Sequence, residues 1–310
     1  MRLLIAEDKH ALYAEQVRGA CPDLQLVASA EPARLREAAG QCEVWLGQPD
    51  LLTPLLREGL RPHWLQSTWA GITPLLATDL PRDYRLTRAV GIFGQVMAEY
   101  VLGHMLAHER RLFARLAAQV AQQWDNSQPR SLRGRRVLVV GCGDIGQAVA
   151  EFLAPFGVEL RGLASQAREQ APFLEVAALD ELPRLSAWAD YVVNLLPDTP
   201  ATRDLYDASL FARFRPQALL INAGRGTAVV DADLVAALER QQLAGAVIDV
   251  CREEPLPAGH PFWAAPRLLL TGHSSAPTDP LLMSALFLDN LSRWQAAAPL
   301  RGEVDFSRGY

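Results

Sequence analysis

The sequence predicts an α/β protein built from two doubly wound parallel sheets. Short apolar runs alternate with helical stretches through residues 1–90, and a second series of this kind begins at Arg135. The chain has 310 residues, of which half are apolar. That length favours two domains, and that composition is sufficient to bury a large core.

The first series predicts a small α/β domain. Its expected strands are residues 3–6, 24–28, 44–46 and 65–67, and its expected helices are residues 11–20, 33–39 and 51–57. Residues 95–121 contain no proline and a single glycine, Gly103, which predicts one continuous helix. A polar linker is expected over 124–132, and a last helix over 278–297.

The second series predicts a larger sheet. Its expected strands are residues 137–140, 158–163, a short one at Val176, 191–196, 218–222, 246–250 and 268–271. Helices are expected over 147–156, in the stretch from Val176 to Leu185 and over 231–240, and Asp231 is the expected N-cap of the last. Polar residues gather after these strands, which is where open parallel sheets bind ligands.

Residues 141–146 (Gly-Cys-Gly-Asp-Ile-Gly) form the glycine pattern G-x-G-x-x-G between an apolar strand and a helix. Gly141 would allow the tight turn, Gly143 would let a pyrophosphate approach the backbone, and Gly146 would let the helix pack on the strand. The helix N-terminus would present free N–H groups to the phosphates. The pattern favours dinucleotide binding, and a purely structural turn is the alternative.

Composition excludes several function classes. The net charge is −5 and no basic stripe is present, so no nucleic-acid partner is expected; Arg133, Arg135 and Arg136 indicate a solvated loop rather than a phosphate patch. The four cysteines form no C-x-x-C pair, which indicates reduced thiols and a cytoplasmic location. An acid at position 7 argues against a signal peptide, and no apolar run could span a membrane.

His104 and His108 have metal-ligand spacing on the predicted helix, but no acidic pattern accompanies them. We expect a packed or solvated helix face there and no metal site.

Three residues that follow predicted strands could act together: Arg225, Glu254 and His273. An imidazole exchanges protons near neutral pH, and a carboxylate beside it would raise its pKa and fix its tautomer. A guanidinium can bind a carboxylate through two hydrogen bonds. Such a trio beside a nicotinamide suits reduction of a 2-oxo acid. Taken singly, each residue has an alternative: Arg225 could be a turn residue, Glu254 a loop acid and His273 a core histidine.

The chain resembles the D-2-hydroxyacid dehydrogenase family over nearly its whole length. The matching segments are 141–146 (GCGDIG), 222–226 (NAGRG), 249–257 (DVCREEPLP) and 272–276 (GHSSA). Within the family it is most similar to the glyoxylate/hydroxypyruvate reductase A group, through 44–47 (VWLG), 95–103, 194–197 (NLLP) and the terminal 308–310 (RGY).

The resemblance implies a Rossmann cofactor domain (101–275) inserted in a flavodoxin-like substrate domain (1–100 and 276–310), and a homodimer. It implies that His273 is the general acid/base, that Glu254 holds and charges it, and that Arg225 binds the substrate carboxylate. Further substrate contacts are implied at Trp45, Ala70, Gly71 and Ile72. Cofactor contacts are implied at Gly141, Gly143, Asp144, Ile145, Gly146, Leu196, Pro197, Ala223, Asp249 and Ser275.

The cofactor choice depends on the end of the second strand of the larger sheet. An acid about 20 residues beyond the glycines would bind the ribose 2′-hydroxyl of NAD, but Ala164 stands at that place. Ser165, Gln166 and Arg168 could instead bind a 2′-phosphate. We therefore expect NADP(H) to be preferred, with NAD(H) as the alternative.

The expected function is reduction of a small 2-oxo acid, such as glyoxylate or hydroxypyruvate, to the D-2-hydroxy acid. The alternatives are an NAD-dependent dehydrogenase of a bulkier substrate and a dinucleotide-sensing binding protein. Two residues depart from the family pattern: Trp69 stands where a small residue is usual, and Gly272 replaces a common proline, which suggests a looser loop before His273.

Overall fold

The computed structural model describes residues 1–307 and divides into two compact units. Residues Met1–Ile92 and the segment from Thr278 onward form the first unit, and Phe93–Pro277 form the second. The first boundary between the units lies between Ile92 and Phe93, just before a helix, whereas the expected boundary at 100/101 lies inside that helix. The second boundary, between Pro277 and Thr278, is close to the expected one at 275/276. The terminal Arg-Gly-Tyr used for the resemblance lies outside the described residues.

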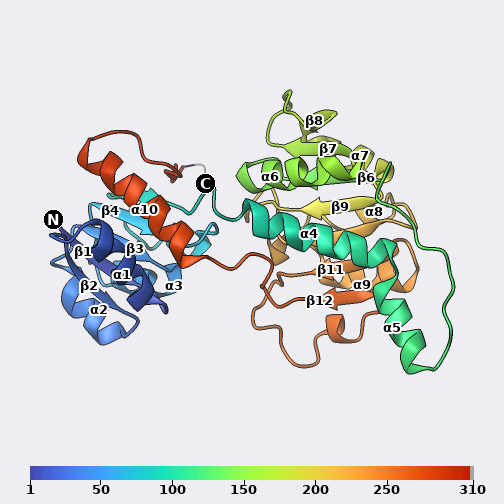
Figure 1. The fold of residues 1–310 in the computed structure, drawn as a ribbon, viewed down its shortest axis with the longest axis horizontal. Coiled ribbons are helices and arrows are strands. Elements are labelled where there is room, and N and C mark those ends of the chain that lie inside the picture. The colour runs from blue at the N-terminus through green and yellow to red at the C-terminus, as the bar shows by residue number, and fades with distance from the viewer. Residues whose placement is uncertain (308–310) are drawn as a thin grey trace. The chain divides into compact units, whose positions relative to one another are not determined.

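The first unit is a five-stranded parallel sheet with helices on both faces, and its strand order, β2-β1-β3-β4-β5, is flavodoxin-like (Figure 1). The strands are β1 (Arg2–Ala6), β2 (Gln25–Ser29), β3 (Val44–Gly47), β4 (Trp64–Ser67) and β5 (Arg85–Thr87). The helices are α1 (His10–Ala20), α2 (Pro32–Ala39), α3 (Pro49–Arg57) and α10 (Pro280–Gln295). Helix α10 belongs here because Trp64 of β4 stacks on its Phe287 and Trp294.

The second unit is a seven-stranded parallel sheet of order β12-β11-β10-β9-β6-β7-β8, the Rossmann order extended by one strand. Its strands are β6 (Arg136–Val140), β7 (Glu159–Ala164), β8 (Glu175–Ala178), β9 (Tyr191–Asn194), β10 (Leu219–Asn222), β11 (Gly245–Ile248) and β12 (Leu268–Leu270). Its helices are α4 (Gly94–Glu109), α5 (Leu112–Val120), α6 (Asp144–Leu153), α7 (Leu182–Trp188), α8 (Ala208–Phe211) and α9 (Asp231–Glu239).

The central strands are buried on both faces, as their unbroken apolar runs predict. In β6, Leu138 and Val140 contribute to one hydrophobic cluster, while Val137 and Val139 contribute to another. Side chains of a strand alternate between faces, so these two clusters are the cores on the two sides of the sheet. No helix within residues 1–307 is long and apolar enough to cross a bilayer.

Two expectations about local structure are wrong, and two short elements were not predicted. The single helix over 95–121 is two helices, because Arg111 adopts a left-handed backbone (φ 56°) that ends α4 and precedes α5. Neither proline nor glycine marks this break. Asp231 is the first residue of α9 rather than its N-cap, which is Val230. The short strand β5 and helix α8 had no recognisable pattern in the sequence.

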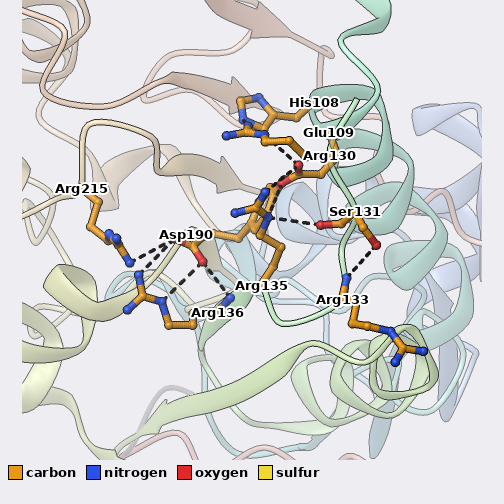
Figure 2. Close-up of polar contacts among 10 residues, drawn as sticks. His108, Glu109, Arg130, Ser131, Arg133, Arg135, Arg136, Asp190 and Arg215 are labelled. Atoms are coloured by element: carbon orange, nitrogen blue, oxygen red, sulfur yellow. Dashed lines mark hydrogen bonds and ion pairs between the residues drawn. The ribbon is translucent and has the colours of Figure 1, made fainter. Parts of the chain in front are cut away.

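Of the three arginines expected in a solvated loop, Arg135 and Arg136 form ion pairs and Arg133 is exposed. Glu109, at the end of α4, is 2% exposed and lies 3.0 Å from both Arg130 and Arg135. Its carboxylate also accepts a 2.6 Å hydrogen bond from the Tyr191 hydroxyl. Figure 2 shows both arginines reaching Glu109, and shows Asp190 between Arg136 and Arg215 in a second cluster. These pairs fasten α4 and the linker to the start of the central strands.

We expect Glu109→Ala to lower the free energy of unfolding by about 2 to 3 kcal/mol, because two arginines and a buried hydroxyl lose their partner. The partial exposure of both arginines keeps the loss below that of a fully buried pair. Denaturant unfolding would measure it. Glu99→Ala removes an exposed acid from the same helix and should change stability by less than about 0.5 kcal/mol. Equal stability of the two variants would contradict the role given to Glu109.

Candidate active site

The predicted reactive residues follow neighbouring strands of the larger sheet. Asn222, Ile248 and Leu270, near the ends of β10, β11 and β12, lie side by side in register. Arg225 comes three residues after the first of them, and His273 three residues after the last. Parallel pairing therefore brings their loops to the same edge of the sheet.

Glu254 and His273 form a direct pair. Glu254 Oε2 lies 2.6 Å from His273 Nδ1, and Glu254 Oε1 accepts a 2.8 Å hydrogen bond from the Cys251 backbone N–H. The bond to Glu254 raises the pKa of His273, although burial opposes it. Burial would raise the pKa of Glu254, but its bonds to His273 and Cys251 outweigh burial and lower it. Because Nδ1 is engaged, Nε2 is the nitrogen left for exchange with a ligand.

Arg225 is held in a turn against the Glu254 segment. Its guanidinium donates to the Gly224 carbonyl at 2.6 Å, and burial lowers its pKa, while Glu254 and Asp198 oppose that shift. A Cβ on Gly226 would lie 2.0 Å from the Cys251 carbonyl carbon, so only glycine allows the two loops to pack this closely. The structure thus brings the Arg225 guanidinium and the Glu254–His273 pair to the same carboxyl edge of the larger sheet.

Asn222 is a positioning residue that the sequence reasoning missed. Its side-chain Nδ2 donates to the Arg225 carbonyl at 3.2 Å, and its Oδ1 accepts from Gly224 N–H and from Asn194. An asparagine that ends an otherwise apolar strand was the available signal, because a buried amide needs partners.

Asp249 holds the loop that carries His273. Its carbonyl accepts from His273 N–H at 2.6 Å, and its carboxylate accepts from Ser274 N–H at 2.8 Å and from Ser275 N–H at 3.2 Å. Gly272 has φ 64°, a value that proline cannot adopt. Glycine thus permits a turn that proline would not, and Asp249 bonds the backbone of that turn, while the expected looser loop stays a prediction.

The glycine motif has the geometry that its sequence predicts. Gly141 has φ 108°, and a Cβ on Gly146 would lie 2.1 Å from the Gly141 carbonyl oxygen. Gly143 is the N-cap of α6, and among the described residues no atom lies within 4 Å of where its Cβ would stand. Asp144 and Ile145 open the helix. The backbone is therefore accessible at the helix N-terminus, where a pyrophosphate would bind.

Arg168 lies beside the glycine loop. Its guanidinium donates to the Cys142 carbonyl at 2.6 Å and to the Gln170 side chain at 2.6 Å. Ser165 and Gln166 are exposed at the end of β7, as the sequence suggested. Leu196 and Pro197 follow β9, and Ala223 follows β10, so these residues also stand at the carboxyl edge of the sheet.

A hollow of about 710 Å³ opens beside the Glu254–His273 pair within the second unit. Its other lining residues are Asp249, Cys251, Pro255, Leu256, Trp263, Leu270, Thr271 and Gly272. Most of this lining is apolar. The histidine therefore faces a space that could hold a small molecule.

The expected substrate residues of the first unit differ in how far they are exposed to solvent. Ala70 and Gly71 are half-buried in the loop after β4, and Ile72 retains 5% exposure. Thr68, just before them, donates a hydrogen bond to the buried carboxylate of Glu7. Trp45 is 0% exposed and its indole N–H donates to the Cys42 carbonyl, and its role in substrate binding stays a prediction.

His104 and His108 are packed residues. His104 lies edge-on to Tyr100, and His108 lies edge-on to Tyr191. Within residues 1–307, no group of three histidine, cysteine or acidic side chains could hold a metal ion.

We expect Glu254→Gln to lower the pKa of the His273 imidazole, because the pair loses the negative charge that stabilises the imidazolium. NMR titration would measure this, with His273→Ala to assign the signal. Glu253→Gln removes the same charge from the exposed neighbouring position and should leave the pKa of His273 unchanged. A titration of Glu254→Gln that matches the wild type would rule out this coupling.

Comparison with known proteins agrees with this geometry. Residues 102–275 match the family model described as D-isomer specific 2-hydroxyacid dehydrogenase, NAD binding domain. A glyoxylate/hydroxypyruvate reductase A from Photorhabdus laumondii is 33% identical over 274 residues, which cover 86% of this chain and 86% of the relative.

Solved structures resemble the whole chain. A D-isomer specific 2-hydroxyacid dehydrogenase family protein from Aeromonas salmonicida is 36% identical, with TM-score 0.92 and coverage of 98% of this chain and 99% of that one. An NADPH-dependent glyoxylate/hydroxypyruvate reductase from Sinorhizobium meliloti, in complex with NADP and sulfate, is 27% identical, with TM-score 0.86 and coverage of 100% and 99%. The sheet orders, the motif geometry and these matches agree: the chain belongs to the D-isomer specific 2-hydroxyacid dehydrogenase family and is an NAD(P)-dependent oxidoreductase.

Proposed function

We propose that the protein reduces a small 2-oxo acid of the glyoxylate or hydroxypyruvate type to the D-2-hydroxy acid, with NADPH as reductant. The Glu254–His273 pair carries this proposal, because it sets an imidazole bonded to a carboxylate, with its pKa raised by that bond, at the edge of a dinucleotide-binding sheet. The relatives from P. laumondii and S. meliloti are named glyoxylate/hydroxypyruvate reductases, which supports this substrate class.

The residues present fit a nicotinamide dinucleotide. The accessible backbone at Gly143 and the N-terminus of α6 would bind the pyrophosphate, and Asp249, Ala223 and Ser275 would stand near the nicotinamide. When bound, the reduced nicotinamide supplies the hydride for the substrate C2.

The chain's own residues supply charge, geometry and a proton. Arg225 would bind the substrate carboxylate and polarise the 2-oxo group. His273 would donate the proton on Nε2 to the oxygen that gains negative charge at C2. Glu254 would raise the pKa of that imidazole and orient its ring through the bond to Nδ1.

We expect purified protein to oxidise NADPH in the presence of glyoxylate or hydroxypyruvate, and His273→Ala to reduce kcat by about 100- to 10,000-fold with NADPH still bound. Steady-state absorbance kinetics and fluorescence titration of NADPH would measure the two quantities. No turnover of either acid by the wild type would refute the proposed activity. Near-normal turnover by the alanine variant would refute the role of His273.

The environment of Arg168 supports NADPH over NADH. Its guanidinium already lies against the glycine loop through the Cys142 carbonyl, and no acid occupies the end of β7 to repel a 2′-phosphate. Ser165 and Gln166, both exposed, would add neutral hydrogen bonds to that phosphate.

Arg168→Ala should therefore raise the KM for NADPH by roughly ten- to a hundredfold, the loss expected for one charge-assisted hydrogen bond. The KM for NADH should change little. Kinetics with both cofactors at saturating 2-oxo acid would test this, with the exposed Arg240→Ala as control. A wild-type preference for NADH, or equal losses with both cofactors, would overturn it.

One observation favours the second candidate, a dehydrogenase of a bulkier substrate. The hollow beside His273 is far larger than glyoxylate needs, and Pro255, Leu256 and Trp263 give it apolar walls. A kcat/KM for phenylpyruvate above that for glyoxylate would favour this candidate.

We also propose a cytoplasmic homodimer. The four cysteines are free thiols, in keeping with a reducing compartment. Helix α5 buries none of its residues, and large apolar side chains along it and just beyond it are exposed: Leu112, Phe113, Leu116, Val120 and Trp124. Such a surface is typical of a subunit interface, and light scattering would report the assembled mass.

A further inference from the structure

A chain of hydrogen bonds leads from helix α4 to the loop that carries His273. The Tyr100 hydroxyl lies 2.9 Å from Thr271 Oγ1, and Thr271 Oγ1 lies 2.6 Å from Asp249 Oδ1. The same Oδ1 accepts from Ser274 N–H, and the other carboxylate oxygen of Asp249 accepts from Ser275 N–H. All five residues belong to the second unit.

The donor and the acceptor of each side-chain hydrogen bond in this series are fixed. Asp249 is 2% exposed and its carboxylate can only accept, so the Thr271 hydroxyl must donate to it. The single hydrogen of Thr271 is then used, so Tyr100 must donate to Thr271. Burial raises the pKa of Tyr100, which keeps that donor protonated. His104 packs edge-on against its ring at 4.5 Å.

The His273 loop needs external restraint. Gly272 and His273 are both left-handed, with φ 64° and 54°. A residue with a side chain in the left-handed backbone region costs about 1–2 kcal/mol. The turn is therefore stable only where surrounding contacts compensate for that cost. The Asp249 carboxylate supplies such contacts on the C-terminal side of the turn. The orientation of that carboxylate in turn depends on its donors, and Thr271 is the one side chain within residues 1–307 that donates to it.

We infer that Tyr100 and Thr271 are positioning residues for His273, acting through the Asp249 carboxylate on the backbone of the His273 turn. This inference rests on the proposed proton-donor role of His273. Neither residue needs to touch substrate or cofactor. Their effect is to fix the imidazole where it bonds Glu254 through Nδ1 and presents Nε2 outward.

Tyr100→Phe tests this with the smallest change, because it removes one hydroxyl and keeps the ring. We expect kcat to fall on the order of tenfold, because a small displacement of a reacting group is costly. The KM for the 2-oxo acid and the affinity for NADPH should stay near wild type. Thr271→Val should have a similar effect and Thr271→Ser, which keeps the hydroxyl, should restore activity.

The matched control is Tyr206→Phe. Tyr206 is a fully buried tyrosine of the second unit, whereas Tyr100 is half-buried, and the Tyr206 hydroxyl has no hydrogen-bond partner within residues 1–307. The same chemical change there should leave kcat intact. If Thr271→Val fails to fold, Tyr100→Phe and Thr271→Ser still decide the question.

Two further measurements separate positioning from general destabilisation. In a His273→Ala background, Tyr100→Phe should cause no additional loss of the residual rate, because the residue it positions is absent. By NMR, Tyr100→Phe should lower the pKa of His273, since a displaced imidazole bonds Glu254 less well; Glu254, Arg225 and Asp249 are the charged groups that act on that imidazole. Tyr206→Phe should leave this pKa in place.

The NMR titration needs no turnover, so it tests the positioning even if no 2-oxo acid is reduced. An unchanged His273 pKa in Tyr100→Phe would overturn the inference, as would equal losses of rate with and without His273. A lowered pKa in a protein that reduces no 2-oxo acid would support the positioning and refute only the proposed function.

Discussion

Parallel strand pairing is the constraint on which the site depends. Leu163, Val140, Asn194, Asn222, Ile248 and Leu270 form one continuous row across six strands of the larger sheet. Each strand runs in the same direction, so the loops that follow this row share one edge. The glycine motif, the Arg225 turn, Asp249 and the His273 turn are all such loops. Strand pairing thereby brings together groups that are separated by more than a hundred residues in the sequence.

Buried polar groups then fix the loops at this edge. Asn222 orders the Arg225 turn, and Asp249 orders the His273 turn. A buried amide or carboxylate is costly unless its hydrogen bonds are made, so each of these residues favours a single arrangement of the backbone around it. At the opposite edge of the same sheet, Glu109 and Asp190 gather the arginines that precede or flank the strands. The reacting pair itself stays accessible: the His273 side chain is 55% exposed.

Much of this arrangement could be predicted from local patterns. The apolar run of β6, the glycines after it and the helix that follows were recognisable because each depends on residues within about twenty positions. The resemblance to a known family located His273, Glu254 and Arg225. Sequence reasoning failed where the cause was distant. The break at Arg111 follows no local helix-breaking residue, and the partners of Thr271 lie 22 and 171 residues away.

The sequence by itself determined the fold class, the order of the elements and the position of the glycine motif, because hydrophobic periodicity and backbone freedom are local properties. Only the tertiary structure decided which side chains restrain the reacting ones. Tyr100, Thr271 and Asp249 have no common pattern in the chain, and their hydrogen bonds exist because α4 and the ends of β11 and β12 pack together. Burial, donor direction and the left-handed turn at His273 depend on that packing, which no local pattern encodes.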